Sequence, residues 1–195
     1  ESLIATKKPL ILSTGMSSWD EIDIAVRILK KNFTILQCSS IYPCPSEKVG
    51  INVIQELKKK YNCPVGFSDH TLGFSAAFAA ASNGATIIEK HFTLSRKMYG
   101  SDAKNSMEPR EFSFFAKNIK EIWKIMDNPV DKNNLSGYKD MKRVFEKSVV
   151  ASHDLKANSI LKKKDIVFKK PGTGIRAINY KSLIGRKLIR DIKKN

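Results

Sequence analysis

Short apolar runs alternate with amphipathic segments along the first two thirds of the chain. The run from Leu10 to Gly15 is apolar and ends in small polar residues, and Ser18 with Glu21 has the spacing of an N-terminal helix capping box. Segment 20–31 then repeats apolar residues at three- and four-residue intervals, as in a helix that packs on a sheet. This part of the chain therefore predicts a strand followed by a helix.

The same pattern occurs three more times. Further strands are predicted over 33–40, 65–69 and 86–93, followed by helices over 47–60, 74–83 and 109–126. Strands that are apolar throughout are typical of parallel sheets, so we expect them to be buried on both faces. Four strand-helix units make half of an eight-fold barrel, and the predicted fold class is α/β, half of a (β/α)8 TIM barrel.

The composition changes after residue 126. Asn, Asp, Lys, Pro and Gly become frequent, which is typical of a linker. Short β-like runs at 148–151 and 166–170, with the turn Pro-Gly-Thr-Gly at 171–174, then predict a small β-rich module. We therefore predict a partial barrel over 1–126, a linker over 127–147 and a β-rich domain over 148–195.

Charge and cysteine content limit the cellular compartments and the partners to be expected for the protein. Three cysteines without a Cys-x-x-Cys pair fit a reducing cytoplasm, and no apolar run has the length of a membrane span. The net charge of +16 could attract nucleic acid, an anionic membrane or an acidic substrate. Because the basic residues are scattered, we interpret the charge as a lysine-rich bias and expect neither nucleic acid nor membrane as a partner.

Polar side chains follow the predicted strands at the end where barrel enzymes place their sites. His70 and His91 end consecutive strands, so both imidazoles could reach one divalent ion, with Asp69 and Glu89 as outer partners. A single strand-end histidine is more often structural, and the sequence leaves both interpretations open. Hydroxyl groups at these ends could hold a phosphate or simply cap strands and helices; they belong to Ser13, Thr14, Ser40 and Ser68.

The amino-acid sequences of several segments resemble motifs of the sialic acid synthase family. These segments are Leu-Ser-Thr-Gly-Met at 12–16, Tyr-Pro-Cys-Pro at 42–45, Gly-Phe-Ser-Asp-His-Thr-Leu-Gly at 66–73, Ile-Glu-Lys-His-Phe-Thr at 88–93, Gly-Ser-Asp at 100–102 and Ser-Met-Glu-Pro at 106–109. In the module, Ser-Val-Val-Ala at 148–151 and Lys-Pro-Gly-Thr-Gly-Ile at 170–175 resemble the antifreeze-like (SAF) domain of that family. The resemblance implies that the chain is the C-terminal half of the barrel, beginning near its fifth strand, followed by a SAF domain that stops short of the usual end.

The resemblance also implies roles for individual residues. His70 and His91 would be catalytic and would bind a divalent metal, Mn²⁺ or Mg²⁺, while Glu89 would be a catalytic residue that hydrogen-bonds water or the reacting groups. Other residues would bind the substrates: Ser13, Ser40 and Ser68 would hold phosphoenolpyruvate, and Tyr42, Asp102 and Lys170 would contact the sugar.

Two lysines, Lys170 and Lys90, lie within these motifs. Lys170 stands where relatives usually have an arginine, which puts its contact with the sugar in doubt because a lysine lacks the bidentate fork. Lys90 lies between Glu89 and His91, so on a strand it should point away from both and take no part in the chemistry.

The implied reaction joins phosphoenolpyruvate to an N-acetylmannosamine-like aldose, giving a nonulosonic acid and phosphate. Legionaminic and pseudaminic acid synthesis are alternatives, and segment 100–109 favours the sialic or legionaminic type over the pseudaminic type. We expect a homodimer in which the SAF domain covers the partner subunit's site, and no activity from this chain without the four preceding strands. A hypothesis of another class is a non-catalytic basic module that binds nucleic acid or acidic glycan.

Overall fold

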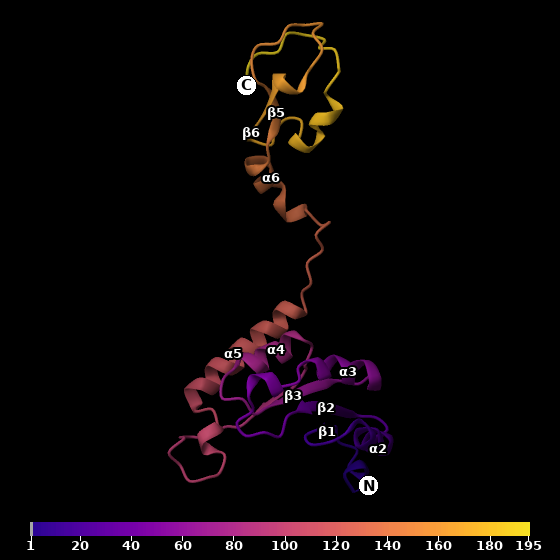
Figure 1. The fold of residues 1–195 in the computed structure, drawn as a ribbon, viewed down its shortest axis with the longest axis vertical. Helices are drawn as coiled ribbons and strands as arrows, with labels where there is room; N and C mark the ends of the chain where they lie inside the picture. Colours follow the sequence, from indigo (N-terminus) through magenta and orange to yellow (C-terminus); the bar gives the residue numbers. More distant parts are fainter. Residues whose placement is uncertain (1) are drawn as a thin grey trace. The chain divides into compact units, whose positions relative to one another are not determined.

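The computed structural model describes residues 2–195. The chain forms two compact units that divide between Pro129 and Val130, and each can be followed separately in Figure 1. Within the described part of the chain, no helix is both long enough and apolar enough to cross a membrane.

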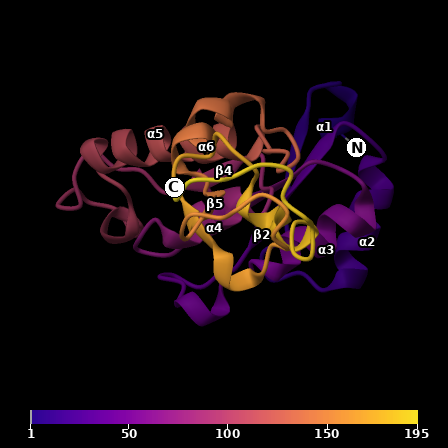
Figure 2. The same ribbon diagram turned by 90° about the horizontal axis from the view of Figure 1, so that it is seen from above.

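The first unit contains one parallel sheet and the helices that cover it. Its four strands are hydrogen-bonded in chain order: β1 (Leu10–Ser13), β2 (Phe33–Cys38), β3 (Val65–Asp69) and β4 (Ile88–Lys90). The helices are α1 (Ser2–Ala5), α2 (Trp19–Leu29), α3 (Asn52–Tyr61), α4 (Ser75–Ser82) and α5 (Pro109–Met126), with 3-10 turns η1 (Ser46–Lys48) and η2 (Ala103–Asn105). This is the predicted half barrel of four strand-helix units, and α2 to α5 follow one another from right to left in Figure 2.

Local sequence signals explain where the helices begin and end. The capping box is formed, with the Ser18 side chain accepting from the Glu21 amide and the Glu21 carboxylate accepting from the Ser18 amide. The prediction that a helix starts at residue 47 was wrong. Ser46–Lys48 forms the separate turn η1, and Gly50 has a φ of +69°, so α3 begins only at Asn52.

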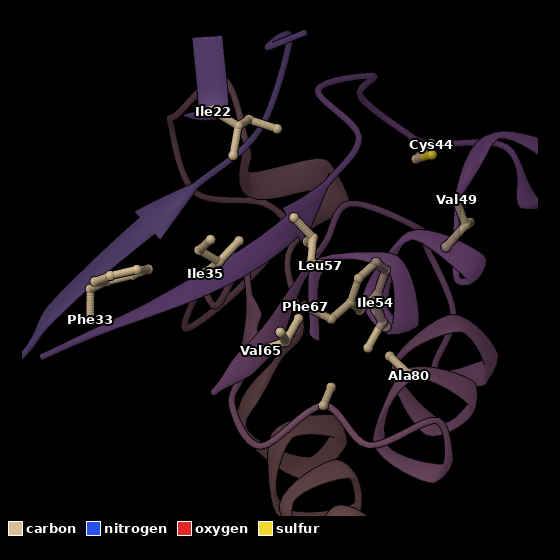
Figure 3. Close-up of a cluster of buried hydrophobic side chains, with 11 residues drawn as sticks. Ile22, Phe33, Ile35, Cys44, Val49, Ile54, Leu57, Val65, Phe67 and Ala80 are labelled. Carbon is tan, nitrogen blue, oxygen red and sulfur yellow. The ribbon is translucent and has the colours of Figure 1, made fainter. Parts of the chain in front are cut away.

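The core lies between the sheet and the helices. Figure 3 shows side chains of α3, including Ile54 and Leu57, facing Val65 and Phe67 of β3. The full cluster is Ile22, Phe33, Ile35, Cys44, Val49, Ile54, Leu57, Val65, Phe67, Ala80 and Ala85. A second cluster joins α4 to α5 through Ala77, Ala81, Met107, Phe115 and Ile119. The residues of the sheet that face the helices therefore form the hydrophobic core.

The expectation that every strand is buried on both faces was wrong. All five residues of β3 are buried, whereas β1 alternates between half-buried and exposed residues. Ile11, for example, is 57% exposed, because its neighbours Leu10 and Leu12 take the positions that pack on the core. Among residues 2–195, only the helix side of β1 is covered, and the other side belongs to the open interior of the half barrel.

The second unit is built around one two-stranded antiparallel sheet. Its elements are η3 (Ser136–Tyr138), α6 (Lys139–Phe145), β5 (Ser148–Ala151), η4 (Lys163–Asp165), β6 (Ile166–Lys169) and η5 (Ala177–Ser182). Ala151, Leu155 and Leu161 form its small core. Both strands lie where the sequence predicts β structure, while α6 lies inside the segment that was expected to be a linker.

Candidate active site

The site is built on the carboxyl ends of β3 and β4. The parallel register pairs Ser68 with Glu89 and Asp69 with Lys90. Because side chains alternate between the faces of a strand, Ser68 and Glu89 project to the barrel interior, and Asp69 and Lys90 project toward the helices. His70 and His91 come next along the chain and return to the interior side.

His70 is held by two backbone contacts. Its Nδ1 lies 2.9 Å from the carbonyl oxygen of Ser39, and its own carbonyl accepts from the Cys44 amide at 2.9 Å. A carbonyl can only accept, so Nδ1 carries the proton and the lone pair of the neutral ring is on Nε2. Sequence reasoning missed Ser39, because a backbone carbonyl leaves no signal in residue type.

His91 presents a buried polar atom with unused bonding capacity. In the part of the chain that the structure describes, its Nε2 is buried and has no hydrogen-bond partner. Buried polar atoms of this kind are uncommon, because each loses its hydration without compensation. The ring centroids of His70 and His91 are 5.3 Å apart, so both imidazoles adjoin the same space.

This pair fits a divalent metal ion as two neutral imidazole ligands. Residues 2–195 contain no group of three or more His, Cys, Asp or Glu side chains placed to hold an ion. Two imidazoles would thus leave the remaining coordination positions to water, substrate or further residues of the protein. The unpartnered Nε2 of His91 is the observation that favours a ligand over a purely structural histidine.

Tyr42 packs against both histidines. Its ring centroid lies 4.1 Å from that of His70 and 5.8 Å from that of His91. Burial raises the pKa of the Tyr42 hydroxyl above its ordinary value, and the negative charges of Asp102 and Glu89 act in the same direction. The hydroxyl therefore stays protonated at neutral pH and can donate to a ligand.

Ser68 and Glu89 form a hydrogen-bonded pair on the interior face of β3 and β4, two residues before the histidines. The Ser68 hydroxyl donates to Glu89 Oε1 at 2.6 Å, and Ser68 is only 3% exposed. Glu89 is exposed, so its other carboxylate oxygen can accept a proton or a hydrogen bond from a bound molecule.

The two remaining serines lie at the ends of β1 and β2. Ser13 is the last residue of β1, and Ser40 follows β2 with its hydroxyl 3.9 Å from Cys38 Sγ. Gly15 lets these two loops approach, because a Cβ at that position would come within 2.2 Å of Ser40 Oγ. The sequence pattern contained Gly15 but gave no sign that it faces Ser40.

Asp102 lies close enough to Tyr42 to act on it electrostatically, whereas Lys170 contacts a residue of its own unit. Asp102 is the exposed residue before η2, and its charge reaches Tyr42. Lys170 belongs to the second unit, where its ammonium lies 4.9 Å from the ring centroid of Phe145. Its role toward the sugar stays a prediction.

Asp69 does not have the position that the sequence suggested. It was expected to support a histidine, yet Oδ2 binds the Lys90 ammonium at 2.9 Å and Oδ1 accepts from the Thr71 amide at 2.8 Å. The reason is strand alternation, which turns Asp69 to the helix side. Lys90 points away from Glu89 and His91, as predicted.

Comparison with known families agrees with this architecture. Residues 1–131 match the NeuB family model, and residues 146–195 match the SAF domain model. The chain belongs to the NeuB family. The SAF match begins just before β5, so the second unit is the domain that the sequence resemblance had implied.

Individual relatives fall into several acceptor classes. The chain is 36% identical over 194 residues to an N,N'-diacetyllegionaminic acid synthase of Campylobacter jejuni, covering 96% of this chain and 58% of that protein. It is 32% identical over 191 residues to a pseudaminic acid synthase of the same species, covering 96% and 55%. The crystal structure of an N-acetylneuraminic acid synthetase from Leptospira borgpetersenii, in complex with citrate, matches 68% of this chain and 47% of that one with a TM-score of 0.62 and 36% identity.

These shares also show how much of a relative the chain represents. It spans 44% to 58% of the length of the curated relatives that it matches. Within that span it contains four barrel strands and the SAF domain.

Proposed function

We propose that this NeuB-family chain carries the histidine half of the active site of a nonulosonic acid synthase. The enzyme would condense phosphoenolpyruvate with an N-acetylmannosamine-like aldose. The observation that carries the proposal is the convergence of His70, His91 and Tyr42, with an unpartnered buried Nε2 on His91. The names of the relatives supply the reaction class, and the polar interior face of β3 and β4 supplies groups suited to it.

His70 and His91 would hold a divalent ion, Mn²⁺ or Mg²⁺, through their Nε2 atoms. When bound, the ion would supply Lewis-acid polarisation of the sugar's aldehyde carbonyl. The Ser39 carbonyl contributes by fixing the proton of His70 on Nδ1, which keeps Nε2 available as a ligand.

The reaction balances without a covalent enzyme intermediate. The enol carbon of phosphoenolpyruvate bonds to the aldehyde carbon, and the aldehyde oxygen gains a proton. Water adds to the carbon that carries the phosphate ester, and one of its protons balances the proton gained by the aldehyde oxygen. As the bond from that carbon to the ester oxygen breaks, the added oxygen becomes the ketone oxygen and its remaining proton leaves with phosphate. Glu89, oriented by Ser68, would accept the proton of the attacking water, because one of its oxygens is not engaged by Ser68.

The other predicted residues would position the substrates. Ser13 and Ser40 would hold phosphoenolpyruvate, at strand ends where hydroxyls and amides bind phosphate. The single proton of the Ser68 hydroxyl is donated to Glu89, so Ser68 would orient Glu89 and is not assigned the phosphate contact that the resemblance implied. Tyr42 and Asp102 would contact the aldose. We place the sialic and legionaminic types of acceptor first, and the pseudaminic type remains an alternative.

Assembly belongs to the same proposal. In a homodimer, the SAF domain of one subunit would cover the other subunit's site, and Lys170 would reach the sugar there. As a single positive charge, Lys170 would give a weaker contact than a bidentate arginine. Replacing Lys170 by Arg should then lower the KM for the sugar, while removal of the SAF domain should abolish the contact.

The decisive experiment restores the barrel. The chain is joined to the four preceding strands of a NeuB-family relative and supplied with phosphoenolpyruvate, N-acetylmannosamine and Mn²⁺. Phosphate and a nonulosonic acid should form in equal amounts, and a chelator should stop both. Phosphate release without a sugar acceptor would contradict the proposal.

A second candidate function rests on the distribution of charge. Of the 35 Lys and Arg residues, 18 lie in 130–195, against 6 of the 19 Asp and Glu residues. The basic excess is thus concentrated in the second unit, and the expectation of an evenly scattered charge was wrong. Such a unit could bind a polyanion, and retention of the chain on DNA that weakens steeply with salt would favour this function.

A further inference from the structure

Lys90 forms a buried cross-link on the helix side of the two strands. Its side chain is 2% exposed and that of Asp69 is fully buried, with 2.9 Å between Nζ and Oδ2. The same ammonium donates to the Thr71 carbonyl at 2.5 Å. Asp69 in turn accepts from the Thr71 amide, so the three residues form a closed set of hydrogen bonds.

The position of this cross-link relates it to both histidines. Asp69 and Thr71 are the residues on either side of His70, and Lys90 immediately precedes His91. The Lys90 ammonium therefore contacts the Asp69 carboxylate on one side of His70 and the Thr71 backbone carbonyl on the other. The contacts lie on the opposite face of the strands, so they can fix the spacing of the imidazoles without touching a ligand.

Stability alone does not explain a buried pair of this kind. Removing two charges from water is costly, and well-packed apolar residues of similar volume are often at least as stabilising. An apolar pair would also lack a directed bond to the Thr71 carbonyl. What Lys90 adds beyond packing is a defined geometry at the two strand ends.

We propose that Lys90 is a positioning residue for the two-histidine site, acting through Asp69 and Thr71. The inference rests on the proposed function in so far as the histidines bind a divalent ion. Loss of the cross-link should let segment 69–71 shift relative to His91 and weaken the site, even when the fold is kept.

The test uses the 195-residue chain and three variants. Lys90→Met removes the ammonium and leaves the Asp69 carboxylate buried, so it should lose stability. Asp69→Asn/Lys90→Met removes both charges and keeps a side-chain acceptor for the Thr71 amide. The matched control is Lys60→Met, because Lys60 also lies 2.9 Å from an aspartate, Asp23, but in that pair the lysine is exposed and the aspartate half-buried, and the two belong to α3 and α2.

The readouts separate positioning from stability. The thermal midpoint of the double variant should return close to that of the parent chain, while its Mn²⁺ affinity, measured from the free-ion electron paramagnetic resonance signal, should stay about 10- to 100-fold weaker. Lys60→Met should change the affinity less than about twofold. Recovery of both properties in the double variant would overturn the proposal, because the site would then not need the cross-link. Failure of the double variant to fold would also overturn it, because the pair would then be required for the fold itself.

A metal-free measurement keeps this test independent of the proposed function. In the parent chain, ¹⁵N-detected NMR should show His70 as a single Nδ1–H tautomer, as its bond to Ser39 requires. The double variant should show mixed tautomers, and an unchanged single tautomer would count against the proposal. If the parent and His70→Ala chains both fail to bind Mn²⁺, the metal role fails, while the tautomer result still decides the role of Lys90.

Discussion

The two faces of the β3–β4 pair differ in how completely their polar groups are bonded. On the helix side, Asp69 and Lys90 are buried and bonded to each other and to Thr71. On the interior side, the His91 Nε2 atom has no partner within the described residues, and Glu89 is exposed with one oxygen bound to Ser68. Residues that are adjacent in sequence therefore differ in whether they have bonding capacity left for a ligand.

This difference separates residues that set geometry from residues that are free to bind. A face whose donors and acceptors are all matched has nothing left for a ligand, whereas incompletely bonded groups in a partly open space retain that capacity. Loss of a single charge on the helix side should thus act first on stability, and substitution of a polar side chain on the interior side should act first on binding and turnover.

The largest effect should come from the histidines. In the enzyme with a restored barrel, His70→Ala or His91→Ala should reduce turnover of phosphoenolpyruvate with N-acetylmannosamine below detection, because each removes one of two imidazole ligands. The 195-residue chain without the preceding strands should itself be inactive. The measurement is phosphate release in the presence of Mn²⁺, with folding checked by circular dichroism.

The third histidine of the chain gives the matched control for this substitution. His153 lies in the second unit, where its Nδ1 is 2.9 Å from the Ser152 hydroxyl. His153→Ala should keep turnover within about twofold of the parent enzyme, as is usual for surface substitutions. Full activity in a His70→Ala/His91→Ala enzyme would remove the basis for treating the interior face as a catalytic site.

Gly66, on the interior face, should affect stability because its neighbours leave no room for a side chain. A Cβ at Gly66 would lie 2.4 Å from Leu36 Cδ2 and 2.7 Å from the Ile87 carbonyl oxygen, a backbone atom that cannot simply rotate away. Gly66→Ala should therefore destabilise the fold by about 1–3 kcal/mol, as overpacking typically does. Urea denaturation measures this, and Gly73→Ala is the control, because its Cβ would meet nothing within 4 Å.

Periodicity predicted much of this fold, and it could have predicted more of the site. The four strand-helix units and the direction of Lys90 followed from the spacing of apolar and polar residues. The same alternation, applied to Asp69, would have placed it with Lys90 and away from the histidines. The family resemblance supplied the residue roles, which the geometry is compatible with but does not by itself assign.

Other features had no signal in the residue pattern. The Ser39 carbonyl that orients His70 is a backbone group, and the approach of Gly15 to Ser40 depends on two loops meeting in space. The turn before α3 depends on a positive φ at Gly50, which a glycine permits but does not require. Each of these depends on tertiary structure and not on local preference.

A smaller effect should follow from Ser68. Ser68→Ala removes the hydroxyl that donates to Glu89, and a hydrogen bond to a charged group contributes about 1.5–3 kcal/mol. Because Glu89 is exposed, water can replace part of this bond, so the loss in kcat/KM should fall at the lower end of that range. Steady-state kinetics measure it, and an unchanged Mn²⁺ affinity would show that the defect lies beside the histidines and not in them.

The smallest effect should come from Tyr42, whose ring and hydroxyl can be separated. Tyr42→Phe keeps the aromatic packing on His70 and removes only the hydroxyl. The pKa of that hydroxyl is raised, so it is protonated throughout the neutral range, and the parent enzyme should lose no activity through its ionisation until the pH exceeds the ordinary tyrosine value of about 10. We expect the variant to raise the KM for the sugar about tenfold or less, which corresponds to the loss of one neutral hydrogen bond, with the Mn²⁺ affinity and the KM for phosphoenolpyruvate unchanged.

Tyr42→Ala should additionally weaken Mn²⁺ binding, because it removes the ring that packs on both imidazoles. Equal sugar KM values for the parent and the Phe variant would show that Tyr42 supports the histidines by packing alone.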